Sequence, residues 1–309
     1  VISDLTAMPL ANCSLLDEST AAAEAATMMY GLRTRDQQKS GANVLFVDEE
    51  IFPQNLSVIQ TRALPQGMKI QVGNYKELAF TPEIFACILQ YPNASGSVED
   101  YREFVEKAHA AHCKVAVDAD IMSLALLVPP GEWGADIVFG STQRLGIPLF
   151  YGGPSAAYFA TRDEYKRNMP GRIIGWSKDK YGKLCYRMAL QTREQHIKRE
   201  KATSNICTAQ ALLATMAGFY AVYHGQEGIT TIASRIHSIT VFLDKQLKKF
   251  GYTQVNAQYF DTLRFELPEH VSAQQIRTIA LTKEVNLRYY ENGNVGFSID
   301  ETTDVAAAN

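Results

Sequence analysis

Apolar runs alternate with amphipathic segments along the first two thirds of the chain. Short stretches rich in Val, Ile and Phe are separated by segments with helical spacing, which is typical of an α/β protein. Because the intervals between strands are short, we expect neighbouring strands to be parallel. The predicted strands are 43–47, 68–72, 85–91, 115–120, 137–139 and 156–160, and the predicted helices are 21–30, 53–63, 97–111, 206–224 and 229–250.

The pattern changes near the carboxyl end. Alternating residues predict strands at 259–267, 285–289 and 294–299, with a helix at 272–280. We therefore expect a large α/β domain with a mainly parallel sheet, residues 1–225, and a smaller α+β domain, residues 226–309. The chain starts without Met and ends in what resembles the first turn of a further helix, so we expect both domains to continue beyond this sequence.

Composition narrows the possible functions. The 309 residues are 46% hydrophobic, enough for a large core, and the net charge of −3 provides no basic field for nucleic acid. No apolar run has the length of a membrane span, and no signal peptide is evident. The cysteines form neither a CxxC pair nor a zinc pattern, so we expect free thiols in the cytoplasm and no metal site. They are Cys13, Cys87, Cys113, Cys185 and Cys207.

Acidic residues end one predicted strand, and a polar turn follows the next. Asp118 and Asp120 end the strand at 115–120, and Ser141 to Arg144, including Gln143, follow the strand at 137–139. Ligands of open α/β sheets bind outside the carboxyl ends of the strands, so these residues are expected to share one crevice. An ordinary surface turn at Gln143 and Arg144 is the alternative.

The spacing of this crevice resembles the large domain of fold-type I pyridoxal phosphate (PLP) enzymes. In those enzymes an Asp pairs with the pyridine nitrogen, and a Lys about that far downstream holds the cofactor as a Schiff base. Position 144 of this chain is Arg. Its guanidinium stays protonated and is no amine nucleophile, so the chain resembles a PLP fold without its lysine.

Two further segments are candidates for binding an anion. Ser19 and Thr20 precede the helix at 21–30 and either hold a phosphate at its start or simply cap it. A basic run that contains Arg193 and Lys198 leads into residues 203–205, which can cap the helix at 206–224. The alternative for this run is a solvated helix face.

Several long motifs resemble the glycine-cleavage P-protein family, glycine dehydrogenase (decarboxylating). These motifs are residues 14–25, 129–137, 151–154, 169–172 and 191–208. The resemblance covers essentially the whole chain. Proteins of this family are built from two similar halves, and this chain resembles more specifically the amino-terminal half, which lacks the PLP lysine. In the lysine-bearing half, a His-Lys pair stands where this chain has Gln143 and Arg144. Phe52 departs from the family's frequent His-Pro, so no ring-stacking or proton-transfer role is carried over to position 52.

The resemblance implies a function for the complete enzyme, which decarboxylates glycine on PLP and passes the aminomethyl group to the lipoyl arm of the H-protein. This chain would be the half or subunit that bears no PLP, inactive alone and without a catalytic residue. It would form a dimer with the PLP-bearing half, in the cytoplasm of a bacterium or the mitochondrion of a eukaryotic relative. Fusion to that half and a separate subunit both remain open.

The resemblance also implies roles for the candidate site residues. The PLP phosphate of the partner half would be bound in trans by Arg193, Lys198, Thr203, Ser204 and Asn205. The vestigial crevice of this chain would consist of Ser19, Thr20, Asp118, Asp120, Gln143 and Arg144. The rival hypothesis is a non-catalytic scaffold or binding module that retains a PLP-enzyme fold.

Overall fold

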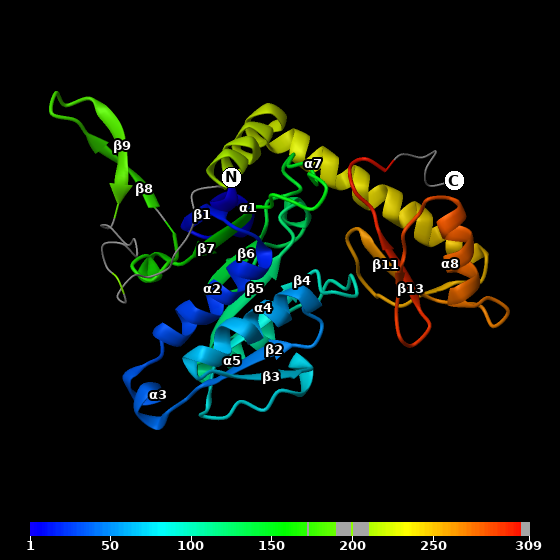
Figure 1. The fold of residues 1–309 in the computed structure, drawn as a ribbon, viewed down its shortest axis with the longest axis horizontal. Coiled ribbons are helices and arrows are strands. Elements are labelled where there is room, and N and C mark those ends of the chain that lie inside the picture. The colour runs from blue at the N-terminus through cyan, green and yellow to red at the C-terminus, as the bar shows by residue number, and fades with distance from the viewer. Residues whose placement is uncertain (172, 190–198, 200–209, 304–309) are drawn as a thin grey trace.

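The computed structural model describes residues 1–171, 173–189, 199 and 210–303. A seven-stranded sheet forms the centre of the larger part, with the strand order β1-β7-β6-β5-β4-β2-β3 (Figure 1). Its strands are β1 (Leu10–Leu15), β2 (Val44–Asp48), β3 (Lys69–Gly73), β4 (Ile84–Tyr91), β5 (Lys114–Ala119), β6 (Ile137–Ser141) and β7 (Ala157–Thr161). Chains with this α/β architecture place ligands at the carboxyl ends of the parallel strands.

The predicted parallel pairing is correct for five strands and wrong for β7. Strands β3, β2, β4, β5 and β6 pair in parallel, whereas β7 runs antiparallel to both β6 and β1. A parallel pair needs a long crossover, usually a helix, but an antiparallel pair does not. The segment between β6 and β7 contains no helix, so the chain turns back beside β6. Strand β1 was not predicted.

Helices cover both faces of the large sheet. On one face, α2 (Glu18–Gly31) and α4 (Pro53–Ala63) pack on a core that includes Leu45, Ile88 and Phe139. On the other, α5 (Arg102–Ala110) and α7 (Ala211–Lys249) pack on Val115 and Val117. Strands β2 and β4 are buried at every position because both faces are covered. Among the described residues, the other short helices of this part are α1 (Ile2–Thr6), α3 (Arg35–Ser40), and 3₁₀ turns at Leu64–Gln66, Tyr75–Glu77, Ser123–Ala125 and Asp163–Tyr165.

Helix α7 leads from the large sheet to a second sheet (Figure 1). The two predicted helices follow each other directly and are separated by a kink at Gly225, where the backbone leaves helical geometry (φ 62°, ψ −175°). Strands β10 (Thr253–Gln254), β11 (Thr262–Glu266), β12 (Arg288–Tyr289) and β13 (Val295–Ser298) form the C-terminal sheet, in the antiparallel order β10-β11-β13-β12. Helix α8 (Ala273–Thr282) connects β11 to β12.

A separate hairpin projects from the large sheet. Strands β8 (Ile173–Lys178) and β9 (Leu184–Ala189) pair with each other around a turn at 179–183, and Figure 1 shows them extending away from the body. Cys87, Cys113 and Cys185 are free thiols. Within the described ranges, no helix combines the length and apolar character needed to cross a membrane.

Candidate functional site

A cleft of about 570 Å³ lies at the carboxyl ends of β4, β5 and β6, where the large sheet faces the C-terminal sheet. This is the edge at which the sequence predicted a crevice. The large sheet and its helices contribute Glu18, Gln90, Asp120, Ser141, Gln143 and Arg144, and the C-terminal sheet contributes Asp261, Arg288 and Tyr290. The cleft therefore has ionisable groups on both walls.

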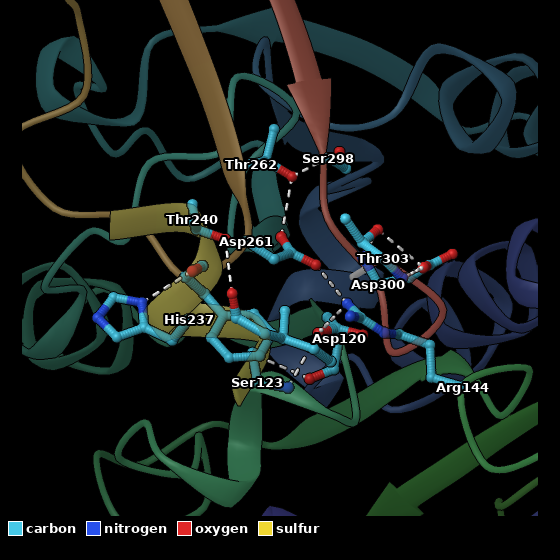
Figure 2. A network of polar contacts seen from close by, with 12 residues as sticks. Asp120, Ser123, Arg144, His237, Thr240, Asp261, Thr262, Ser298, Asp300 and Thr303 are labelled. Carbon is cyan, nitrogen blue, oxygen red and sulfur yellow. Dashed lines mark hydrogen bonds and ion pairs between the residues drawn. The ribbon is translucent and has the colours of Figure 1, made fainter. Parts of the chain in front are cut away.

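Arg144 links the two walls of the cleft. Its Nη1 donates to Asp120 Oδ2 at 3.0 Å and to Asp261 Oδ2 at 2.5 Å, as Figure 2 shows. Burial lowers the pKa of the Arg144 guanidinium, but the charges of Asp120 and Asp261 outweigh it and raise that pKa above its ordinary value. Arg144 is therefore a permanent cation that connects the segment after β6 to the start of β11.

The two aspartates are fixed by further hydrogen bonds. Asp120 Oδ2 also accepts from the Ser123 backbone N–H at 2.9 Å. The hydroxyl of Thr262 is 2.9 Å from Asp261 Oδ1 and 2.7 Å from Ser298 Oγ, so the network continues to β13 (Figure 2). These contacts hold Arg144 in one position between the sheets.

Asp118 lies beneath the cleft, fully buried at the end of β5. Its Oδ2 accepts a hydrogen bond of 2.5 Å from Asn55 Nδ2, and Asn55 Oδ1 in turn accepts from Ser19 Oγ at 2.5 Å. The Glu18 carboxyl is also hydrogen-bonded to the Asp118 carboxyl. Asp118 thus takes its partners from the start of α2 and from α4.

Glu18 and Asp118 require a proton between them. Asp118 Oδ1 is buried and has no donor among the described residues if both carboxyls are ionised. Burial and the Glu18 charge raise the pKa of Asp118, and burial raises the pKa of Glu18. Two carboxyl groups in contact cannot both ionise easily, so one shared proton both supplies the missing hydrogen bond and removes the repulsion.

The start of α2 differs from the sequence-based interpretation. The capping residue is Asp17, whose Oδ1 accepts from the Thr20 N–H at 2.6 Å, so the interpretation of Ser19 or Thr20 as the cap is wrong. Asp17 and Glu18 also place two acidic side chains at this helix start, where they compete with any external anion. Neither Ser19 nor Thr20 is among the residues that line the cleft.

The other predicted residues divide into two groups. Gln143, Asp120 and Arg144 line the cleft, together with Phe52, which precedes α4. The proposed phosphate-binding residues Arg193, Lys198, Thr203, Ser204 and Asn205 lie outside the described residues, as does the predicted start of the long helix at 206.

Three important residues were missed in the sequence. Glu18 lies in the motif at 14–25, just before the predicted helix. Only the neighbouring hydroxyls of Ser19 and Thr20 were considered there, as capping or phosphate-binding groups. Asn55 follows the predicted helix start at Pro53. Asp261 contacts Arg144 from 117 residues away, and nothing in its local sequence indicates that partner.

The crevice of this chain does not fit covalently bound PLP. Asp118, which the sequence spacing predicts at the position of the Asp that pairs with the pyridine nitrogen, is already held by Asn55 and Glu18. Arg144, at the predicted lysine position, is held by two aspartates. Among the described residues that line the cleft, none is a lysine. No catalytic step on PLP is therefore assigned to this crevice.

Comparisons with known proteins show the family of this chain. The family model of the glycine cleavage system P-protein matches residues 1–308. The glycine dehydrogenase (decarboxylating) of Bacteroides thetaiotaomicron is 86% identical over the whole chain, which spans 32% of that protein. A crystal structure of glycine decarboxylase (P-protein) in inhibitor-bound form aligns with a TM-score of 0.88 and 27% identity, covering 99% of this chain and 71% of that one.

More distant structures share the fold alone. The Oryza sativa TDC structure with PLP and tryptamine aligns with a TM-score of 0.71 at 8% identity, covering 99% of this chain and 71% of that one. The α/β fold is therefore that of fold-type I PLP enzymes. The chain spans about a third of the length of the curated relatives it matches. The chain belongs to the glycine cleavage system P-protein family.

Proposed function

We propose that this chain is part of the amino-terminal half of the P-protein and that it bears no PLP. In the complete enzyme, glycine is decarboxylated on PLP held by the other half, and the aminomethyl group passes to the lipoyl arm of the H-protein. The observation that carries the proposal is Arg144, a permanent cation at the lysine position, fixed by Asp120 and Asp261. A guanidinium in two ion pairs cannot serve as the amine of a Schiff base.

The role of this chain is then to complete the other half's site. PLP, when bound there, supplies the electron sink for the reaction. Arg193 and Lys198 would contribute charge, and Thr203, Ser204 and Asn205 would contribute donors to the PLP phosphate across the interface. The chain would bind, orient and neutralise the phosphate, and it would exclude water from the interface.

Exposed apolar residues on the projecting hairpin support assembly with a partner. Ile174, Trp176 and Tyr186 lie on one face of β8 and β9, because Trp176 is directly opposite Tyr186 and side chains alternate along a strand. Trp176 is 70% exposed. Soluble proteins rarely expose such a cluster unless it forms an interface. The first half of α7 adds the exposed side chains of Leu212, Phe219, Val222 and Tyr223.

The division into domains and the location in the cell are part of the same proposal. Residues 1–225 would form the large domain and residues 226–309 the smaller one, with Gly225 at the boundary. The complete protein would act in the cytoplasm of a bacterium, in agreement with its bacterial relatives. The rival function, a scaffold with no part in cofactor binding, predicts that residues 203–205 are irrelevant to PLP.

The test is the double substitution Thr203→Ala with Ser204→Ala in the complete enzyme, measuring PLP affinity and glycine–bicarbonate exchange. Each charge-assisted or N-terminal hydrogen bond contributes roughly 1.5–3 kcal/mol where water is excluded, so the loss of each contact should weaken PLP binding about 10- to 100-fold. The matched control is Ser238→Ala with Thr278→Ala, two exposed helix hydroxyls that bond to their own helix. Wild-type affinity and exchange in the test variant would favour the scaffold.

A further inference from the structure

Two arginines of the C-terminal sheet enclose one tyrosine. The guanidinium carbon of Arg264 lies 4.1 Å from the centroid of the Tyr290 ring, and that of Arg288 lies 4.6 Å from it. Arg264 Nη1 donates to Ser95 Oγ at 2.9 Å, and Arg288 Nη1 donates to the Ala94 carbonyl at 2.7 Å. Within the described part of the chain, neither guanidinium forms an ion pair with a carboxylate. The Glu50 carboxylate reaches Arg264 only through Ser95 Oγ, which donates to Glu50 Oε2 at 2.5 Å, so the two positive charges of this cluster have no described carboxylate in direct contact.

The hydroxyl at the centre of this cluster has no partner either. Tyr290 Oη is buried and, among the described residues, forms no hydrogen bond, and the same is true of Arg264 Nε. A buried donor that remains unpaired costs about 1–3 kcal/mol, so such a group in a native site requires a further partner, either ordered water or a ligand. Arg288 and Tyr290 both line the cleft, whereas Arg264 lies behind them. Of the two residues with unpaired atoms, Tyr290 therefore belongs to the wall of a space that can hold a small molecule.

The charges of the cleft lining define the class of that molecule. Asp120 and Asp261 share the single cation Arg144, and the cleft-lining Glu18 shares one proton with Asp118, so this wall carries an excess of negative charge, while Arg288 forms no ion pair with a carboxylate among the described residues. A dianion such as phosphate would add two negative charges beside these carboxylates. A molecule with one carboxylate and one ammonium group instead complements both uncompensated charges.

We propose that this cleft binds a small zwitterionic amino acid, with its carboxylate at Arg288 and the Tyr290 hydroxyl and its ammonium group toward Asp120 and Asp261. The cleft volume of about 570 Å³ is within the range of small-molecule sites. The amide side chains of Gln90, Asn93 and Asn286 line the same space and supply further donors and acceptors. This site is separate from a PLP site in the other half, and it does not depend on the proposed function.

The decisive variant is Tyr290→Phe in the complete protein, because it removes only the unpaired hydroxyl and keeps the ring between the two guanidiniums. Equilibrium dialysis with labelled glycine, the smallest zwitterionic amino acid, counts the sites per chain. We expect Tyr290→Phe to retain the wild-type melting temperature without glycine and to weaken one glycine site about tenfold or more. Arg288→Gln should weaken the same site further. The matched control Arg277→Gln, an arginine stacked over Tyr289 and not part of the cleft lining, should bind as the wild type does.

Acetate carries only the carboxylate of the proposed ligand, and methylamine carries only its ammonium group. Each should compete at the site at least tenfold more weakly than glycine, because each satisfies only one of the two uncompensated charges. Acetate competing as well as glycine would overturn the ammonium contact. Wild-type glycine binding in both Tyr290→Phe and Arg288→Gln would overturn the site. If the other half bound no glycine, the proposed function would fail, but the wild type would still show one glycine site and Tyr290→Phe would still weaken it. The experiment therefore tests the cleft site independently of the proposed function.

Discussion

Arg144 holds two aspartates that would otherwise repel each other inside the cleft. Replacing it by Gln leaves Asp120 and Asp261 without their shared cation, and Asp261 is only 8% exposed. Breaking a buried ion pair from one side is strongly destabilising, so Arg144→Gln should lower the free energy of unfolding by roughly 3 kcal/mol. The Arg144 side chain is 21% exposed, so water partly screens its charge. The expected loss of stability is therefore at the low end of the range for broken buried ion pairs.

Chemical denaturation of the chain measures this loss. The double variant Arg144→Gln with Asp261→Asn removes one of the unpaired charges and should recover part of the stability. A single variant Arg144→Gln as stable as the wild type would show that the ion pairs contribute nothing, and that the link between the sheets rests on apolar packing.

Glu18 is a second residue whose protonation matters. Glu18→Gln offers a permanent amide N–H to Asp118 Oδ1 and should leave the stability within about 1 kcal/mol of the wild type. Glu18→Ala removes the donor and should cost about 1–3 kcal/mol, because a buried carboxyl oxygen is left unsatisfied. The measurement is the unfolding midpoint of both variants at neutral pH. Equal destabilisation by Gln and Ala would argue against a shared proton.

At the scale of elements, the break in α7 depends on a single glycine. Gly225 adopts φ 62° and ψ −175°, which side-chain-bearing residues rarely adopt, although a Cβ there would meet no atom within 4 Å. Gly225→Ala should therefore destabilise the chain by about 1–2 kcal/mol through backbone strain alone.

Gly218 provides the matched control within the same helix. It has no positive φ, and an added Cβ would again meet nothing within 4 Å, so Gly218→Ala should stabilise the chain by roughly 0.5–1 kcal/mol. Melting temperatures of the two variants should move in opposite directions. A shift of the same sign in both would remove the assigned role of Gly225.

Elements with strong local patterns could be predicted from the sequence. Helix α4 begins at Pro53 as expected because proline is favoured in the first turn, and β4 was recognised by its continuous apolar run. Helix α5 begins at Arg102 and not at Ser97, because Ser97 instead forms a β-bridge with Tyr259. Strand β1 was missed because Asn12 and Ser14 interrupt its apolar pattern.

The candidate site could be predicted from topology more than from motif. Because parallel strands end at one edge of a sheet, the strand pattern alone places Asp120, Gln143 and Arg144 in the same cleft. Their partner Asp261 could not be predicted, since its contact depends on how the second sheet packs against the first. The capping role of Asp17 was overlooked because several capping residues occur in succession.

At the scale of the whole molecule, stability should depend on the titration of Asp48. Burial, followed by the charges of Glu50 and Glu49, raises the pKa of Asp48 to about 6, against about 4 in an unfolded chain. The folded state therefore binds the proton more tightly, and its stability falls as pH rises from about 4 to 6, by on the order of 2–3 kcal/mol. Above pH 6 Asp48 is ionised in both the folded and the unfolded state, so the stability stays at this lower value.

The variant Asp48→Asn tests this dependence. Asn keeps an acceptor for the Glu50 N–H but cannot ionise, so it should be more stable than the wild type at pH 7–8 and similar to it below about pH 4. Unfolding curves across this pH range check the prediction. A difference between variant and wild type that does not change with pH would show that Asp48 does not titrate in this way.

The central claim is that this chain belongs to a PLP enzyme and yet carries no PLP. Borohydride reduction of the complete protein with PLP bound, followed by digestion and mass spectrometry, locates every Schiff base directly. With Arg144 at the predicted lysine position and no lysine among the described residues lining the cleft, we predict one pyridoxyl-lysine outside residues 1–309 and none within them. A stoichiometric pyridoxyl adduct on one specific lysine of this chain would contradict the account.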